Sequence, residues 1–246
     1  MRHIAWFSCG AASAVAAKLA LDKWLDTKVV YCDTSASEHP DNIRFMRDIE
    51  SWLKVDVVRL KSERYSSIDD VFEATRYMSG IAGARCTIEM KKLPRFNFQQ
   101  LCDIHVFGFT LDETKRATKF WENNPDLQLE PILIDFGVTK GDCLRIITKA
   151  GIELPAMYKL GYKNNNCLGC VKASSAAYWQ SIRRDFPEVF ARRAKQSREI
   201  GCRLTRIKGK RIFLDELPEG YFGNHRMENI SCGPDCAGKK TYKEVL

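Results

Sequence analysis

Long hydrophobic runs are missing from this 246-residue sequence, and no stretch approaches the roughly 20 apolar residues that a membrane-spanning helix requires. The opening segment, residues 1–7, is expected to be a strand, too short and too soon interrupted for a secretion signal. Internal repeats and low-complexity tracts are also missing. We therefore expect no membrane association and a cytoplasmic location. In that reducing compartment, closely spaced members of the ten cysteines favour metal binding or catalysis over disulfides.

The composition is that of an ordinary globular protein, with 45% hydrophobic and 28% charged residues. A chain of this length buries enough apolar surface to fold without disulfides or metals, so a metal site would need its own reason. The net charge of +8 suits an anionic partner, although many soluble proteins carry such a charge without one. Basic residues concentrate between Arg183 and Arg211, which fits either a nucleic-acid backbone or a solvated helix face.

Short apolar runs alternate with amphipathic runs in the first half of the chain. This alternation predicts an α/β fold with a mostly parallel five-stranded sheet and helices on both faces. In such sheets, ligands bind beyond the carboxyl ends of the strands. The predicted strands are His3–Phe7, Lys28–Cys32, Asp56–Leu60, His105–Gly108 and Leu129–Ile134, and the predicted helices are Ala11–Leu25, Pro40–Lys54, Met90–Cys102 and Asp112–Asn123.

The pattern changes after residue 138. A helix over Thr139–Ala150 precedes a Gly- and Asn-rich loop, and two further helices are expected at Ala176–Arg184 and Pro187–Ile200. A basic hairpin with its turn at Gly209 follows, and from Pro218 the chain is expected to lack regular structure. We therefore expect a nucleotide-binding α/β domain over residues 1–150 and a helical, basic, Cys-rich region over residues 151–246.

A turn of small residues follows the first strand: Ser8, Cys9, Gly10, Ala11, Ala12 and Ser13. Small side chains let backbone amides approach an anion closely, and the positive end of the following helix dipole lies at the same place. The two serines add hydroxyl groups. On these residues alone, a phosphate-binding loop and a tight turn that binds nothing are equally good interpretations.

Four later motifs favour the phosphate-binding interpretation. In order they are Tyr31-Cys32-Asp33-Thr34, the run from Cys86 through Lys91 and Lys92 to Pro94, the run from Gly108 through Glu113 to Arg116, and Pro155-x-x-Tyr158-x-x-Gly161-Tyr162 followed by Cys167-x-x-Cys170. With the turn, they resemble the PP-loop superfamily of adenine nucleotide alpha hydrolases, most closely its phosphoadenylyl-sulfate (PAPS) reductase-like branch.

This resemblance implies an adenine nucleotide, either ATP or an adenylyl sulfate, bound by the turn at residues 8–13 together with Asp33, Thr34 and Gly108. It also implies that Lys91 and Arg116 neutralise phosphate or sulfate charge. Two positions depart from the family pattern: Cys9 replaces a glycine, and Ala12 replaces an aspartate that would help to hold a magnesium ion. Asp33 could substitute for that aspartate as a magnesium ligand.

Cysteines form two close pairs, Cys167 with Cys170 and Cys232 with Cys236. Such pairs can direct two thiolates at one metal. The resemblance adds Cys86, so that Cys86, Cys167 and Cys170 with either Cys236 or Cys232 would hold a [4Fe–4S] cluster. Zinc is the alternative if the two pairs form the site alone.

Three functions fit these features. The first is adenylylation of an acceptor followed by sulfur transfer, as in relatives that thiolate nucleic acids. The second is reduction of an adenylyl sulfate with Cys232 as the attacking thiol. The third is a non-enzymatic nucleotide- or nucleic-acid-binding protein with a structural metal. The expected partner is a nucleotide, a nucleic-acid acceptor is an option, and homo-oligomer formation stays open.

Overall fold

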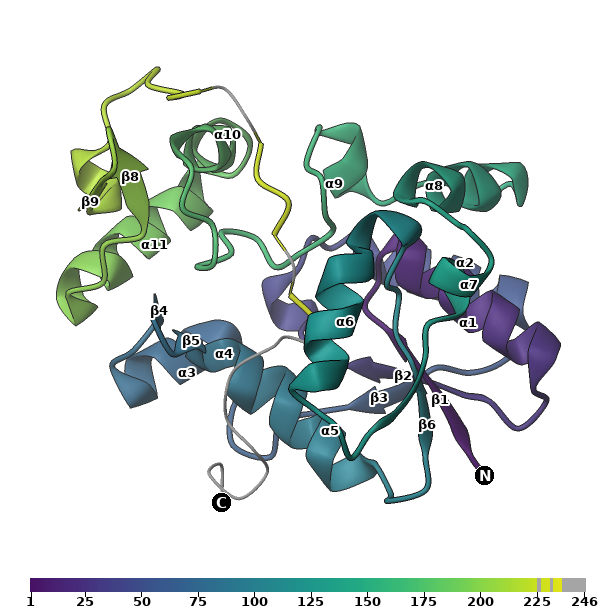
Figure 1. Cartoon of the computed structure of the whole chain (residues 1–246). Helices are drawn as coiled ribbons and strands as arrows, with labels where there is room; N and C mark the ends of the chain where they lie inside the picture. The colour runs from purple at the N-terminus through teal and green to yellow at the C-terminus, as the bar shows by residue number, and fades with distance from the viewer. Residues whose placement is uncertain (225–226, 231, 236–246) are drawn as a thin grey trace.

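A five-stranded parallel sheet forms the centre of the N-terminal half (Figure 1). The computed structural model of the chain describes residues 1–224, 227–230 and 232–235. The strands run side by side in the order β3-β2-β1-β6-β7, and every neighbouring pair is parallel. This confirms the predicted α/β class and the parallel sheet. The bounds are β1 (His3–Phe7), β2 (Lys28–Cys32), β3 (Val58–Leu60), β6 (Ile104–Val106) and β7 (Gln128–Glu130).

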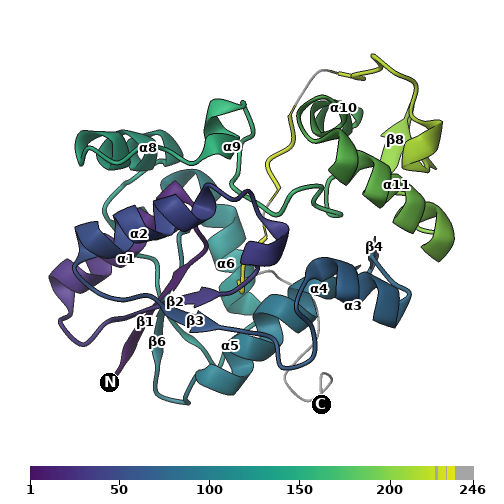
Figure 2. The ribbon, with the colours of Figure 1, turned by 180° about the vertical axis from the view of Figure 1, so that it is seen from behind.

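Helices cover both faces of this sheet, because both faces of its central strand are apolar. In β1, Ala5 and Phe7 pack against α1 (Ala11–Lys23), α2 (Asn42–Leu53), α7 (Ile132–Asp135) and α8 (Lys140–Lys149). The alternate residues Ile4 and Trp6 belong to a separate core with α5 (Leu93–Phe98) and α6 (Thr114–Glu122). Figure 1 shows α5 and α6 in front of the sheet, and Figure 2 shows α1 and α2 over its opposite face.

The predicted strand Leu129–Ile134 is wrong beyond Glu130. Strand β7 ends there, and residues 132–135 form the short helix α7, in which Ile132 and Leu133 are fully buried. Pro131 cannot donate to a strand ladder, and a short apolar run fits a buried helix as well as a strand. The predicted helix Met90–Cys102 is shifted: the segment begins as α4 (Arg85–Thr87), passes through a π-helical turn η2 (Ile88–Lys92), and ends with α5 at Phe98.

A further hydrophobic core joins segments that are far apart in the sequence. It is called the second core below, to distinguish it from the cores packed against the sheet. It packs Ile68 and Phe72 of α3 (Ile68–Thr75) with Trp179 and Ile182 of α10 (Ala176–Asp185) and with α11 (Pro187–Ile200). The remaining elements are β4 (Ser79–Gly80), β5 (Gly83–Ala84), η1 (Ser35–Ser37), η3 (Leu111–Glu113), α9 (Ala156–Lys159), β8 (Thr205–Ile207), β9 (Lys210–Ile212) and η4 (Leu214–Glu216).

The predicted basic hairpin is confirmed as the antiparallel pair β8 and β9. Lys208 and Gly209 both have positive φ angles, of 47° and 81°, as the two central residues of a type I′ turn require. In the described ranges, no helix is both long and apolar enough to cross a membrane.

Candidate functional site

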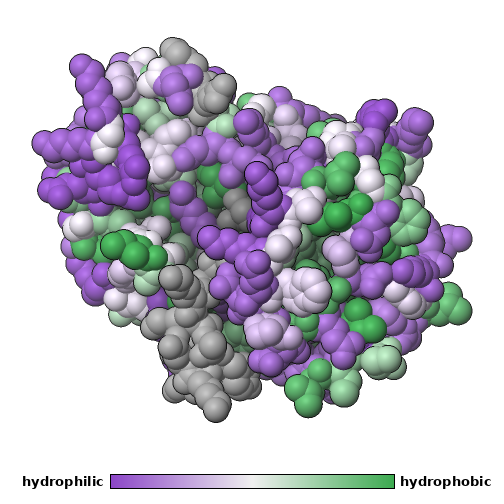
Figure 3. Space-filling model, in the orientation of Figure 1, coloured by the Kyte–Doolittle hydropathy of each residue, from purple (hydrophilic) through white to green (hydrophobic). Residues whose placement is uncertain are grey.

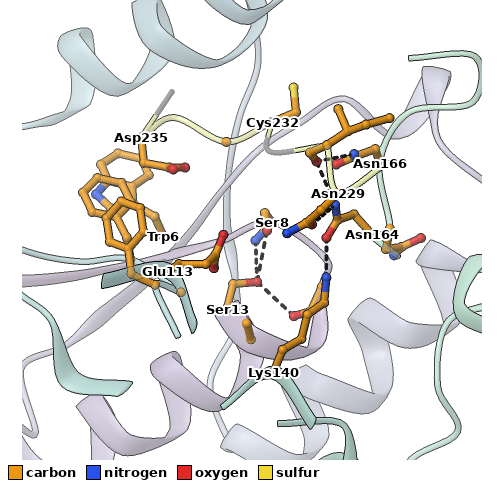
Figure 4. A pocket seen from close by; sticks show the side chains of 18 of the residues that line it. Trp6, Ser8, Ser13, Glu113, Lys140, Asn164, Asn166, Asn229, Cys232 and Asp235 are labelled. Carbon is orange, nitrogen blue, oxygen red and sulfur yellow. Dashed lines mark hydrogen bonds between the residues drawn. The ribbon is translucent and has the colours of Figure 1, made fainter. Parts of the chain in front are cut away.

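The main pocket lies where the strand order reverses. From β1 the chain continues on one side to β2 and β3, and later on the other side to β6 and β7, which opens a crevice beyond the carboxyl ends of β1 and β6. The space there is about 700 Å³, including its open mouth. Its floor is formed by Ser8, Gly10, Ala12, Ser13 and Gly108 (Figure 4).

Ser13 fixes the turn that forms this floor. Its Oγ accepts a hydrogen bond from the Ser8 amide at 3.0 Å, donates to the Gly10 carbonyl at 2.9 Å, and lies 3.1 Å from Ser8 Oγ. At the start of α1, the Ala11 amide donates to the Tyr158 hydroxyl at 3.4 Å. The Ala12 and Ser13 amides have no partner in the described part of the chain. The turn therefore presents amides at the positive end of a helix, as an anion seat requires.

Gly108 lets the two loops approach closely. A Cβ atom built at this position would lie 2.7 Å from the Ser13 nitrogen and 2.9 Å from its Cα. Any side chain at residue 108 would therefore displace the turn. This close packing explains why the motif that runs from residue 108 to Arg116 begins with a glycine.

Cys9 has a structural place in the turn. Its φ of 57° is left-handed, and its thiol is buried and donates to the Asn42 carbonyl at 3.7 Å. Burial raises the pKa of this thiol well above its ordinary value. Cys9 and Ala11 do not line the pocket, unlike the other four residues of the turn.

Arg116 lines one wall of the pocket and is paired with carboxylates there. Its Nη1 lies 2.5 Å from Glu113 Oε1, and its Nη2 contacts Asp235. Glu113 is held in place by the capping box of η3, which starts at Thr110. The pocket therefore holds a guanidinium and two acids, all of them lining residues.

Two predicted nucleotide-binding residues, Asp33 and Thr34, do not line the pocket. The Asp33 carboxylate accepts from the Ser35 amide and hydroxyl at 3.0 and 2.6 Å. Thr34 is buried and donates to Glu38 at 2.5 Å. Both follow β2, one strand away from the crevice.

Several pocket residues come from parts of the chain that the sequence motifs did not include. Lys140 lies at the start of α8 and donates to the Asn164 side chain. Asn165 Nδ2 donates to the Cys9 carbonyl at 2.7 Å, while its buried Oδ1 has no hydrogen-bond partner among the described residues. Three aromatic residues close the apolar side: Trp6, Phe107 and Phe109. The Asn run after Gly161 was the visible signal in the sequence.

The C-terminal segment crosses the mouth of the pocket. Asn164 Nδ2 donates to Asn229 Oδ1 at 2.6 Å, and Asn166 Nδ2 donates to the Ile230 carbonyl at 2.7 Å. Residues 232–235 continue along the wall to Asp235. In Figure 4 the asparagines lie between the lysine and this segment. The end of the chain therefore contributes directly to the site.

Four thiols gather behind this wall: Cys86, Cys167, Cys170 and Cys232, referred to below as the four-thiol group. Figure 4 shows the Cys232 sulfur pointing away from Ser8 and Ser13. Its hydrogen bond with Cys170 lowers the pKa of Cys232 well below the ordinary value and raises that of Cys170. Burial, with the nearby Cys232 charge, raises the pKa of Cys86 to about 12. Burial likewise raises the pKa of Cys167.

Lys91 connects the four-thiol group to the pocket wall. This lysine is buried, does not line the pocket, and donates from Nζ to the Cys232 carbonyl at 3.2 Å. Its charge also lowers the pKa of the Cys232 thiol. The structure thus places Lys91 beside the thiols rather than on the pocket surface.

The predicted metal ligands are the thiols of the four-thiol group together with Cys236 as an alternative to Cys232. Cys236 lies outside the described residues. Within the described ranges, no three Cys, His, Asp or Glu side chains are placed to hold one metal ion. Four thiols from three segments are nevertheless the donor type that a [4Fe–4S] cluster takes.

The sequence was also compared with known proteins. No protein-family model and no curated protein matches it.

Proposed function

We propose that this chain is an adenine-nucleotide enzyme of the PAPS reductase-like PP-loop type, which carries out chemistry at the α-phosphate and at sulfur. The observation that carries the proposal is the wall formed by residues 232–235. It lines the pocket on one side, and Cys232 joins the four-thiol group on the other. The main pocket and the four-thiol group therefore share one short segment.

The nucleotide would be bound by three kinds of contact. The turn at Ser8–Ser13 would cradle phosphate or sulfate with its backbone amides, and Arg116 would neutralise charge that develops during the reaction. The aromatic side of the pocket would take the adenine ring. Arg116 would then exchange a carboxylate partner for the bound anion.

The first of two candidate reactions is adenylylation coupled to sulfur transfer. An acceptor oxygen bonds to the α-phosphorus of ATP, and the bond to pyrophosphate breaks. A hydrosulfide or persulfide donor then displaces AMP from the acceptor, so that one C–O bond is replaced by a C–S bond. The polar groups at the pocket mouth, including Lys140 and the asparagines, would orient the acceptor.

Reduction of an adenylyl sulfate is the second reaction, and the contact between Cys232 and Cys170 favours it. The Cys232 thiolate attacks the sulfate sulfur, and AMP leaves. A small-molecule thiol then attacks the Cys232 sulfur and displaces sulfite, so that two thiols are oxidised to a mixed disulfide while sulfate sulfur is reduced. The Cys232 side chain would have to turn toward the pocket for this attack.

A [4Fe–4S] cluster is the cofactor that we propose for the four-thiol group, with Cys86, Cys167, Cys170 and either Cys232 or Cys236 as donors. When bound, such a cluster supplies electron transfer or a site for sulfur. Zinc in the same thiols would have a structural role. Anaerobically purified protein should then be brown, with a broad absorption band in the blue, whereas bound zinc would leave it colourless.

Product analysis tests the function. Purified protein is incubated with ATP plus candidate acceptors, or with adenylyl sulfate plus a thiol reductant. Pyrophosphate release indicates adenylylation, and sulfite release indicates reduction. Ser13→Ala should weaken nucleotide binding about fivefold, because the turn loses hydrogen bonds worth roughly 1 kcal/mol.

Cys232→Ser separates the roles of this residue, with Cys102→Ser, an exposed thiol, as the matched control. Loss of sulfite formation with unchanged iron content identifies a nucleophile, and loss of iron identifies a ligand. Nucleotide binding without either product would favour the non-enzymatic binding protein. Absence of adenine-nucleotide binding would refute the proposal.

A further inference from the structure

The basic residues between Arg183 and Arg211 fall into two classes in the structure. Those on α10 and α11 are largely neutralised by acids, as in the pairs of Arg184 with Asp185, Arg193 with Asp69, and Arg198 with Asp215. Most helix cations are therefore paired with acids, and the buried Arg193 is among them, so that these helices leave little net positive charge.

The β8–β9 hairpin behaves differently. Its five cations are all exposed, and within the described residues none makes an ion pair with an acid: Arg203, Arg206, Lys208, Lys210 and Arg211. Arg206 is directly opposite Arg211 in the register of the two strands. Like charges at directly opposite positions destabilise a strand pair, so a bound anion would relieve this repulsion.

A hollow lies beside this hairpin. Arg206 and Lys208 line it from the hairpin, and Tyr221 lines it from the facing segment. Glu228 also lines it, but its carboxylate accepts hydrogen bonds from the Ser174 and Ser175 amides. The hydrophilic surface over β8 and β9 is visible as a purple area at the upper left of Figure 3. Cations next to a half-exposed aromatic ring are the combination that binds single-stranded nucleic acid, by phosphate contacts and base stacking.

Residues 227–230 run from the hollow, which Met227 and Glu228 line, to the main pocket, which Asn229 and Ile230 line. Met227 and Glu228 line both the hollow and a small intermediate cavity. Asn164 and Ile230 line both that intermediate cavity and the main pocket. A linear polymer bound at the hairpin would therefore lie beside a segment that also borders the main pocket.

We propose that the β8–β9 hairpin and the hollow beside it bind a single-stranded polynucleotide and present it to the main pocket. The proposed binding surface rests only on the hairpin cations and on the hollow beside them. The further statement that the polynucleotide is the acceptor substrate rests on the proposed function.

Binding can be measured by fluorescence anisotropy with labelled oligonucleotides of about 12 residues, one of DNA and one of RNA, over a range of salt concentrations. With four phosphate contacts, the slope of log affinity against log salt should be about −3. Arg206→Glu/Arg211→Glu should reduce the magnitude of this slope by about 1.4 and weaken binding at least tenfold. Tyr221→Leu should weaken binding about fivefold through lost stacking and leave the slope unchanged.

The matched control is Arg145→Glu/Lys149→Glu, which makes the same charge change on the exposed face of α8, distant from the hairpin in Figures 1 and 2. Its affinity should stay within twofold of the wild type. Arg206→Lys/Arg211→Lys should retain most binding. The comparison of DNA and RNA affinities shows which polymer is preferred.

Equal losses in the hairpin variant and the α8 control would overturn the proposal, as would equal binding of polyglutamate or anionic vesicles. Calorimetry with an adenine nucleotide separates the two proposals. If the wild type binds the nucleotide but no oligonucleotide, only this inference is refuted. If the wild type does not bind the nucleotide, the proposed function is refuted.

Discussion

Gly108 shows how one missing side chain shapes the site. Gly108→Ala would place a methyl group 2.7 Å from the Ser13 nitrogen, and the obstructing atoms are backbone that cannot rotate away. We expect the turn to shift, nucleotide affinity to fall at least tenfold, and the free energy of unfolding to drop by about 1–3 kcal/mol. Gly141→Ala is the control, since it lies in α8, where the added Cβ would meet Thr139 Oγ1 at an ordinary contact distance of 3.8 Å, and it should stabilise by roughly 0.5–1 kcal/mol. Equal effects of the two substitutions would contradict this account.

His105 is predicted to make stability depend on pH. Trp6 Nε1 can only donate, so the 2.9 Å bond to His105 Nδ1 requires that nitrogen to accept. Burial lowers the pKa of His105 to about 4, from 6.5. As pH falls from 6.5 to 4, the unfolded chain binds a proton that the folded chain does not, and stability declines by up to about 3 kcal/mol.

Urea titrations at several pH values measure this effect. His105→Gln removes the titrating group, so its stability should change less between pH 6.5 and 4.5 than that of the wild type. An identical pH dependence in both proteins would show that other groups are responsible.

The sequence indicated those pocket residues whose position depends on local structure. Ser8, Gly10, Ser13 and Gly108 follow strands at the switch point of a parallel sheet, and their small size is visible in the motif. Lys140 and Asn165 were missed because only tertiary packing brings them to the pocket. Asp33 follows a strand too, yet its carboxylate is directed at Ser35, an orientation that periodicity does not specify.

At the scale of elements, a carboxylate from the C-terminal segment holds the start of α10. Glu228 accepts from the Ser174 amide and hydroxyl at 2.7 Å and from the Ser175 amide at 2.9 Å. Glu228→Gln should lower the free energy of unfolding by about 1–2 kcal/mol, because hydrogen bonds to a charged acceptor are lost. Urea denaturation measures the change. The control Glu188→Gln, in the first turn of α11, should cost only a few tenths of a kcal/mol. A Glu228 effect no larger than that control would rule out the capping role.

The strands β1 and β2 were predictable because they are almost completely buried and read as apolar runs. Helix α3 was missed, although Ser67 and Asp70 form its capping box and were a readable start signal. The apolar run after Pro131 was ambiguous because its length fits a strand as well as a helix. In the structure it packs as a helix in one core with α1.

At the scale of the whole molecule, the chain returns from its second core to close the pocket in its first. Residues 227–230 are fixed by Asn164 and Asn166, and Asp235 is paired with Arg116. Sequence patterns report local periodicity, so this long-range return of an irregular segment was not visible in them. The site therefore depends on both cores being folded.

Asp235 is then expected to compete with the nucleotide. Its buried carboxylate lines the pocket and occupies one arm of the guanidinium that we propose for the phosphate or sulfate. Asp235→Asn keeps the shape and removes the negative charge, so adenine-nucleotide affinity should rise about fivefold, equivalent to ~1 kcal/mol. Calorimetry with ATP and an adenylyl sulfate measures this.

Glu219→Gln removes an exposed acid outside the pocket lining and should leave the nucleotide affinity within twofold. Arg116→Ala should weaken binding, and adding Asp235→Asn to it should give little further change, because the carboxylate acts through the arginine it pairs with. An affinity that falls in the single Asp235→Asn variant would mean that the carboxylate orders the wall for the nucleotide instead of competing with it.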